Sequence, residues 1–231
     1  MRSPGKSLPH FKLEEALKKE GCAVCRLIED AAHSYLDNLL YELVNDPSVQ
    51  QELRDSLGLC NRHAYQMLEF GDGLGTAILY RVVVEEELAR LDKLSKKGRP
   101  SSGLSSLLGR GDADGSLPEP GAGCMVCRAE EEAEERYLQV LLEGARDGSL
   151  KGLLDGPGAV CIRHLGRAAE QAGGSLPRAL QERARAELVD LKNGLEKYVR
   201  HKDYRFKDEP WGKERDSWRR AVSRMVGRKQ E

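Results

Sequence analysis

The chain has 231 residues, of which 39% are hydrophobic and 32% are charged, and its formal net charge at pH 7 is -1. Such a composition is typical of a soluble protein with modest hydrophobic cores and long solvated helix faces. The near-neutral charge excludes any argument from overall charge for binding to nucleic acid or to an anionic membrane.

The N-terminal residues 1–10 contain Arg2 and Lys6, but no apolar stretch follows them. We therefore expect no secretory signal peptide, and no apolar run approaches the length needed to span a bilayer. These features predict a cytoplasmic protein, in which thiols stay reduced and free to bind metal.

Residues 1–97 are expected to form the first helical unit. After the pair Cys22-x2-Cys25, leucines recur at i, i+3, i+4 and i+7 from Leu36 to Leu43, which predicts an amphipathic helix that starts at the pair. It should end near Asn45–Pro47, before a short element that leads to Cys60-x2-His63. A further helix, a glycine-rich break at 71–75 and a long helix should follow.

Residues 98–123 are rich in Gly, Ser and Pro and lack hydrophobic periodicity, so we expect a flexible linker. Residues 124–198 then repeat the first unit, because both cysteine pairs open with the string Gly-Cys-x-Val-Cys-Arg. At an offset of 102, Tyr35 and Leu36 match Tyr137 and Leu138. We interpret this as an internal duplication. Since no segment shows strand alternation, the predicted fold is all-α, with two duplicated helical units.

Every cysteine of the chain falls into one of two sets of metal-ligand type. In sequence order, these sets are Cys22, Cys25, Cys60 and His63, and then Cys124, Cys127, Cys161 and His164. Three thiolates and one imidazole are the ligands of a closed, tetrahedral structural zinc site. We therefore expect two Zn²⁺ ions per chain, each of which clips one helical unit.

Other interpretations of the cysteines remain open. An even number of cysteines permits disulfides, although no export signal is visible. A thioredoxin-like pair would require a strand before it in an α/β pattern. An iron–sulfur cluster with Cys3His ligation is chemically admissible, and oxidation of a zinc thiolate would allow redox sensing. A catalytic zinc site usually keeps one position open for water, which four protein ligands would close.

An arginine lies next to a ligand at four matching positions: Arg26, Arg62, Arg128 and Arg163. They could neutralise the thiolates or donate hydrogen bonds to sulfur, and they could equally be ordinary solvated residues.

Residues 199–231 form a basic segment that also contains both tryptophans, Trp211 and Trp218. Interleaved basic and aromatic groups are typical of surfaces that bind single-stranded nucleic acid. However, Trp218, Val222 and Met225 follow helical spacing, which favours a terminal helix that docks its apolar face on the rest of the protein.

The paired Cys-x2-Cys and Cys-x-Arg-His motifs are followed by Asp203-Tyr204-Arg205 and by Glu209-Pro210-Trp211-Gly212. In this combination the chain resembles an uncharacterised bacterial family, known as a domain of unknown function. The resemblance covers nearly the whole chain and implies a bacterial cytoplasmic protein, but it brings no activity, cofactor or partner.

No nucleophile–base pair or pair of carboxylates stands out as catalytic, so we predict a binding or regulatory role rather than an enzyme. The alternatives are an iron–sulfur electron carrier or redox sensor, and nucleic-acid binding through the C-terminal segment. A protein partner is expected, without membrane insertion.

Overall fold

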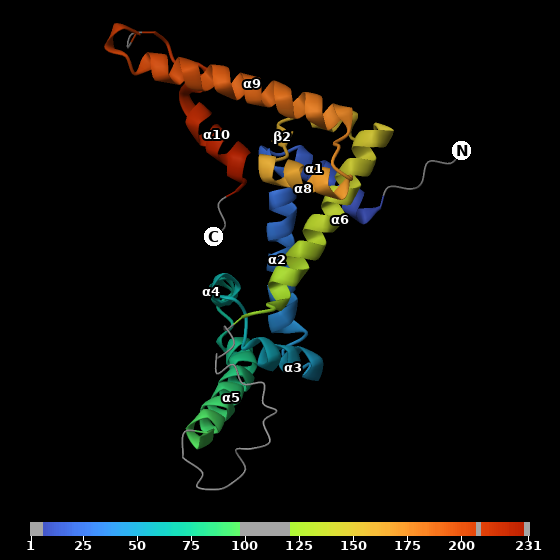
Figure 1. Ribbon diagram of the computed structural model, residues 1–231, viewed down its shortest axis with the longest axis vertical. Coiled ribbons are helices and arrows are strands. Elements are labelled where there is room, and N and C mark those ends of the chain that lie inside the picture. The colour runs from blue at the N-terminus through green and yellow to red at the C-terminus, as the bar shows by residue number, and fades with distance from the viewer. Residues whose placement is uncertain (1–6, 98–120, 207–208, 229–231) are drawn as a thin grey trace, which may run out of the picture. The chain divides into compact units, whose positions relative to one another are not determined.

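The structure, a computed structural model, describes residues 7–97, 121–206 and 209–228. It is helical nearly throughout these residues, which confirms the all-α class (Figure 1). The described residues form two compact units. Unit 1 is drawn from the ranges Met1–Ala31 and Glu130–Gln230, and unit 2 from Ala32–Ala129. The chain passes from one unit to the other within helix α2 (Ala23–Tyr41) and again within α6 (Met125–Asp147).

These units differ from the segments 1–97 and 124–198 that the duplication suggests. Unit 1 combines the first part of segment 1–97 with most of segment 124–198. The boundaries between the units fall inside α2 and α6, so each of these helices contributes residues to both units. Residues 98–120 of the expected linker lie outside the described residues. Within the described residues, no helix has both the length and the apolar character needed to cross a bilayer.

Unit 1 contains, besides its parts of α2 and α6, the helices α1 (Leu8–Leu17), α7 (Lys151–Leu154), α8 (Ile162–Gln171), α9 (Arg178–His201) and α10 (Ser217–Val226), the 3-10 helices η2 (Tyr204–Phe206) and η3 (Lys213–Asp216), and the strands β1 (Gly21–Cys22) and β2 (Gly158–Ala159). Its core is built on leucines at helical spacing. Leu13 and Leu17 of α1 are fully buried together with Leu141 of α6 and Leu150. Removing such side chains from water is the main stabilising contribution to this unit.

The strands β1 and β2 pair in parallel, with Gly21 opposite Gly158 and Cys22 opposite Ala159. The sequence did not predict them, because a strand of two residues is too short to show alternation. The pairing places the first cysteine pair beside the segment that leads to Cys161.

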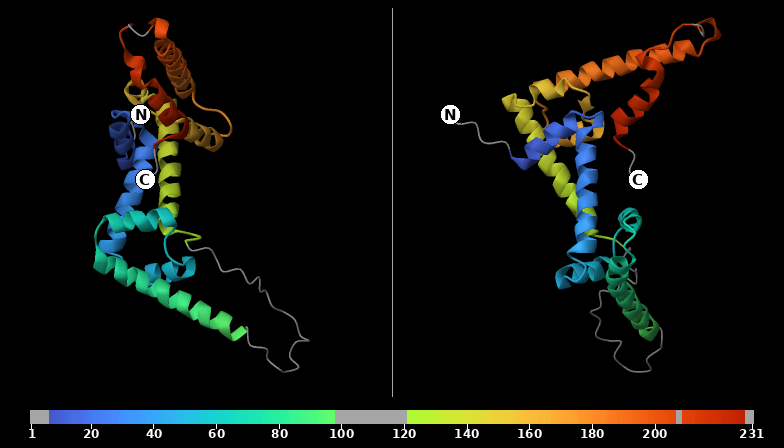
Figure 2. Two further views of the ribbon diagram at one scale, coloured as in Figure 1. Left: turned by 90° about the vertical axis from the view of Figure 1, so that its left-hand side faces the viewer. Right: turned by 180° about the vertical axis from the view of Figure 1, so that it is seen from behind.

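Helix α10 leaves α9 at an angle and also packs against α8 and β1 (Figure 2). It docks by a different face from the one expected, since Ser217 and Arg224 are its buried residues. Trp218, Val222 and Met225 are instead 44%, 60% and 52% exposed. The apolar-face prediction was therefore wrong for these three side chains.

Unit 2 contains the end of α2, the helices α3 (Pro47–Ser56), α4 (Asn61–Glu69) and α5 (Gly73–Lys97), and the start of α6. The break predicted at Asn45–Pro47 is the N-terminus of α3, where the Asp46 carboxylate accepts hydrogen bonds from the backbone N–H groups of Ser48 and Val49. Leu36 and Leu39 of α2 pack with Leu53, Met67 and Leu79 to form the core. Unit 2 is thus a second, smaller core around its own helices.

Candidate metal centres

The four ligand segments all lie at helix starts, as the sequence predicts. Cys25 lies in the first turn of α2, and Cys124 directly precedes α6. Cys60 and Cys161 are the N-cap residues of α4 and α8, with nearly the same backbone angles (φ -63°, ψ 161° and φ -60°, ψ 159°). The positive end of each helix dipole therefore faces a thiol, which favours the thiolate form.

The structure pairs these segments in a way that the sequence order did not. Cluster 1 consists of Cys22, Cys25, Cys161 and His164, and cluster 2 of Cys60, His63, Cys124 and Cys127. Each cluster thus takes its Cys-x2-Cys pair from one repeat and its Cys-x2-His pair from the other. The expectation that consecutive motifs share an ion was wrong, because it assumed that each repeat folds on its own.

Cluster 1 lies entirely within unit 1. The Nδ1 atom of His164 is 3.4 Å from Cys22 Sγ, 3.5 Å from Cys25 Sγ and 3.2 Å from Cys161 Sγ. The sulfurs of Cys25 and Cys161 are 3.9 Å apart. The backbone N–H of Cys161 donates to Cys22 Sγ, so the chain segments joined by β1 and β2 also meet through a sulfur.

Cluster 2 lies entirely within unit 2 and has similar dimensions. His63 Nδ1 is 3.3 Å from Cys60 Sγ, 3.5 Å from Cys124 Sγ and 3.4 Å from Cys127 Sγ, and Cys60 Sγ is 3.6 Å from Cys127 Sγ. The segment before Cys124 is held by a hydrogen bond of 2.7 Å from Gly121 N–H to the Ser56 carbonyl. A Cβ atom on Gly121 would lie 2.5 Å from Cys60 Cα, so only glycine permits this approach.

These spacings fit one tetrahedral ion in each cluster. Zn–S bonds of about 2.3 Å and Zn–N bonds of about 2.0–2.1 Å require S···S edges of about 3.8 Å and S···N edges of about 3.6 Å. The observed S···S distances of 3.6 and 3.9 Å lie close to that value, and the S···N distances of 3.2–3.5 Å are only slightly shorter. All six thiols are free of disulfide bonds. Both clusters could therefore hold a metal ion without rearrangement of the backbone.

The thiols share protons unequally in both clusters. Burial raises the pKa of Cys124, but hydrogen bonds from His63 and from nearby backbone N–H groups outweigh it and lower this pKa to about 6. Burial and the neighbouring thiolates raise the pKa of Cys127 to about 12. In cluster 1, burial lowers the pKa of His164, but contacts with Cys161 and Cys25 raise it to about 9. Ion binding would displace the protons on these groups, so metal affinity should fall as pH falls.

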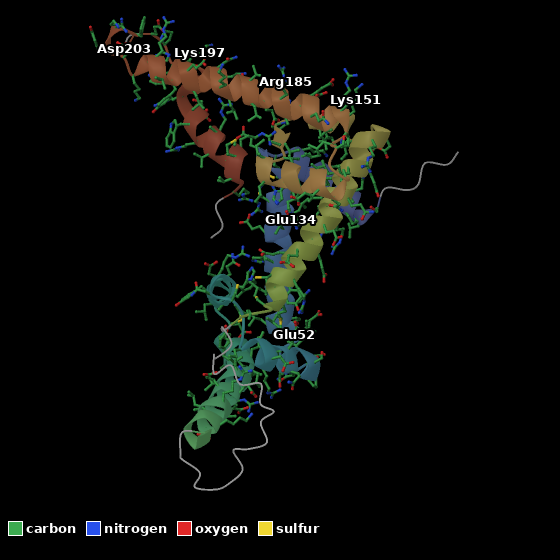
Figure 3. The ribbon with its side chains drawn as sticks, in the orientation of Figure 1. Glu52, Glu134, Lys151, Arg185, Lys197 and Asp203 are labelled. Atoms are coloured by element: carbon green, nitrogen blue, oxygen red, sulfur yellow. The ribbon has the colours of Figure 1, made fainter. Side chains whose placement is uncertain are left out.

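Cluster 1 has a carboxylate behind its histidine. Glu134 of α6 is labelled in Figure 3. Its Oε1 atom lies 3.2 Å from His164 Nε2, the ring nitrogen that is not the one close to the sulfurs. When Nδ1 binds a metal ion, Nε2 carries the proton and can donate it to Glu134, which fixes the ring and raises the basicity of its other nitrogen. Glu134 was not among the predicted site residues, although a carboxylate three residues before the buried Tyr137 on an apolar helix face was a usable signal.

The first repeat has no carboxylate at the position that corresponds to Glu134. At the offset of 102 that aligns Tyr35 with Tyr137, the counterpart of Glu134 is Ala32, which is buried. The two repeats thus share their ligands but differ at this position.

The arginines beside the ligands serve different purposes. Arg26 Nη2 donates to the Glu20 carbonyl, and Arg128 pairs with the Glu52 carboxylate. Arg163 Nη2 lies 3.0 Å from His164 Nε2 and brings a positive charge to cluster 1. Within the described residues, none of these three arginines donates a hydrogen bond to a ligand sulfur.

Gly227, at the end of α10, lies against cluster 1. It has φ of +90°, and a Cβ atom there would lie 2.8 Å from Cys25 Sγ and 3.4 Å from Cys161 Sγ. The end of α10 can therefore reach the sulfurs only because residue 227 has no side chain. Neither its spacing nor its neighbours in the sequence indicated this role.

The fold and the clusters define an all-helical protein with two Cys3His groups at metal-binding distances. Residues 6–231 match the family described as "Family of unknown function (DUF6062)", and the chain belongs to this family, which confirms the resemblance stated above. It is 27% identical over 195 residues to the "Uncharacterized 23.9 kDa protein in xynA 3'region" of Caldicellulosiruptor sp. (strain Rt8B.4), with 83% of this chain and 87% of that protein covered. No solved structure matches the chain significantly.

Double substitutions should distinguish the two ways of pairing the ligands. Replacing Cys22 and Cys161 by Ser removes two ligands from cluster 1 and should cost the chain one of two bound ions. Replacing Cys22 and Cys60 by Ser removes one ligand from each cluster and should cost both. The metal-to-protein ratio after gel filtration measures this, and the reverse result would restore the sequential pairing.

Removing the Glu134 carboxylate should weaken cluster 1 alone. Glu134→Ala leaves His164 without its acceptor, and we expect the metal affinity of cluster 1 to fall roughly 10–100-fold. Competition with a chromophoric chelator measures both affinities in one titration. Glu135→Ala, an exposed neighbour on the same helix, is the matched control, and an equal loss in both variants would contradict the role of Glu134.

A methyl group at residue 227 should also disturb cluster 1. Gly227→Ala places a Cβ atom against Cys25 Sγ, so the metal affinity of cluster 1 should fall while that of cluster 2 stays unchanged. Gly174→Ala has a similar positive φ of +95° but no atom within 4 Å, and therefore controls for backbone strain. The same chelator competition would refute the contact if both variants behave alike.

Proposed function

We propose that this protein is a zinc protein in which one structural Zn²⁺ ion holds each unit together, and that it acts as a binding or regulatory protein rather than an enzyme. The observation that carries the proposal is the spacing of the ligand atoms. In each cluster they all lie within 4.8 Å of one another, and the distances given above, 3.2–3.9 Å, are close to the edges of a single zinc tetrahedron. With four protein ligands per ion, no position is left for a substrate or a catalytic water.

The small cores give the ions a structural purpose. Each unit buries a limited set of leucines, and a Cys3His-bound ion would join segments far apart in the sequence at helix starts. Because an unfolded chain does not present such a site, the binding free energy of the ion adds to the stability of the folded unit.

Redox sensing through zinc thiolates is the second candidate. Cys25, Cys60 and Cys127 are only partly buried, so oxidants in solution can reach one or two sulfurs of each cluster. Oxidation of a ligand would release the ion and loosen the unit. A multinuclear iron–sulfur cluster is less favoured, because the ligand atoms of each group all lie within 4.8 Å of one another, which is close for ligands spread over several iron atoms.

Binding of single-stranded nucleic acid remains a further prediction for the C-terminal segment. The ring of Trp211 is stacked on His201 at 4.4 Å and lies near Tyr198, so one of its faces is used within the protein. The expected protein partner and the cytoplasmic location also remain predictions.

Metal analysis of anaerobically purified protein tests the proposal. We expect two zinc ions per chain and no visible absorption. Removal of the ions with a strong chelator should reduce the far-UV helical signal and lower the unfolding temperature, and Zn²⁺ should restore both. Iron with a visible absorption spectrum would overturn the zinc assignment, and an unchanged fold and melting temperature without metal would overturn the structural role.

A further inference from the structure

A cavity of about 840 Å³ lies within unit 1, between β1, β2, α9 and α10. Cys22 and Cys161 of cluster 1 form part of its wall, and most of the other residues that line it have charged side chains. Its volume falls in the range of small-molecule sites, about 300–1,000 Å³.

Arg224 of α10 is the unusual residue of this wall. It is only 7% exposed, and its Nη2 atom lies 2.7 Å from Glu187 Oε2 of α9. Among the described residues its Nε and Nη1 atoms, which are also buried, have no hydrogen-bond partner. Proteins seldom bury a guanidinium with two donors unsatisfied. Both atoms have almost no accessible surface, so an anion in the cavity would supply the missing acceptor after a small shift of the Arg224 side chain.

The charges around Arg224 do not balance. Arg183 Nε lies 2.6 Å from Glu187 Oε1, so Arg183 and Arg224 share one carboxylate. The wall as a whole contains six arginines and four carboxylates. Arg228 of the wall also pairs with Glu29, which lies outside the wall, at 2.6 Å. A divalent ion held by three thiolates in cluster 1 would add one further negative charge, so the excess of positive charge is local to the Arg183–Glu187–Arg224 group.

Some of the remaining arginines already have partners. Arg220 pairs with Asp216 and lies 3.7 Å from Asp190. Arg219, in contrast, lies over the ring of Trp218 at 4.8 Å and forms no ion pair with a carboxylate in the part of the chain that the structure describes. Arg224, which shares Glu187 with Arg183, and Arg219 are therefore the two α10 arginines best placed to bind an anion.

We propose that this cavity binds a small organic oxyanion, a phosphate ester or a carboxylate, with Arg224 as its main anchor and Arg219 as a second cation. Guanidinium groups form charge-assisted hydrogen bonds with both kinds of anion. The cavity is much larger than an inorganic anion, which leaves space for an organic part. The site is independent of the proposed function, since the unsatisfied donors of Arg224 do not depend on which metal the clusters hold.

Titration calorimetry on the purified, metal-loaded chain tests the site. The probes are glycerol 3-phosphate, succinate and inorganic phosphate at constant ionic strength, with glycerol as the neutral control. Saturable binding of glycerol 3-phosphate alone would identify a phosphate site, and of succinate alone a carboxylate site. Binding of inorganic phosphate but of neither organic probe would contradict an organic ligand, and no saturable binding would overturn the proposal.

Three variants show whether the cavity is the place of binding. Arg224→Gln should weaken binding by about tenfold to a hundredfold, because it removes charge-assisted hydrogen bonds. Arg219→Ala, an exposed position, keeps the test valid if Arg224→Gln does not fold, and should weaken binding about threefold or more. Arg178→Ala is the control, since this α9 side chain is 90% exposed and lies outside the cavity. Unchanged binding in Arg219→Ala and Arg224→Gln, or an equal loss in Arg178→Ala, would overturn the assignment.

Discussion

The exchange of ligand pairs between the two repeats is the constraint on which the rest of the structure depends. A tetrahedral site requires four ligand atoms within about 4 Å of one another, and a Cys-x2-Cys or Cys-x2-His pair supplies only two of them. The other two must come from another part of the chain. In this protein they come from the other repeat, so Cys22 meets Cys161 and Cys60 meets Cys127.

This exchange explains why the compact units do not follow the order of the repeats. Helix α2 has 19 residues and is therefore roughly 28 Å long, so it carries the chain away from the Cys22–Cys25 pair before the next ligand pair begins. In unit 1 the parallel pairing of β1 and β2 brings the Cys22 segment to the segment that leads to Cys161. In unit 2 the close approach of Gly121 to Cys60 brings together the segments that carry the other two ligand pairs. Each unit thus depends on contacts between residues that are more than 60 positions apart in the sequence.

The two clusters share their ligands but not their surroundings. His164 has the Glu134 carboxylate behind it, and the end of α10 lies against the sulfurs of cluster 1 at Gly227. The same helix brings Arg224 to Glu187 and closes one side of a charged cavity. Unit 1 therefore combines a candidate metal centre with a candidate ligand site, and α10 contributes to both.

The sequence by itself determined the features that depend on neighbouring residues. The i, i+3 spacing of the ligands, the helix starts at Cys25, Cys60 and Cys161, and the break at Asp46 all follow from local geometry, and so does the all-α class. Only the tertiary structure decided which ligand pairs meet, which face of α10 is buried, and that Glu134 and Arg224 lie beside cluster 1 and the cavity. These outcomes depend on contacts between distant segments, and both pairings of the motifs satisfy the same local rules. Local periodicity could not select between the two pairings, because they differ only in which distant ligand pairs meet. That outcome depends on the path of the chain through its tertiary fold.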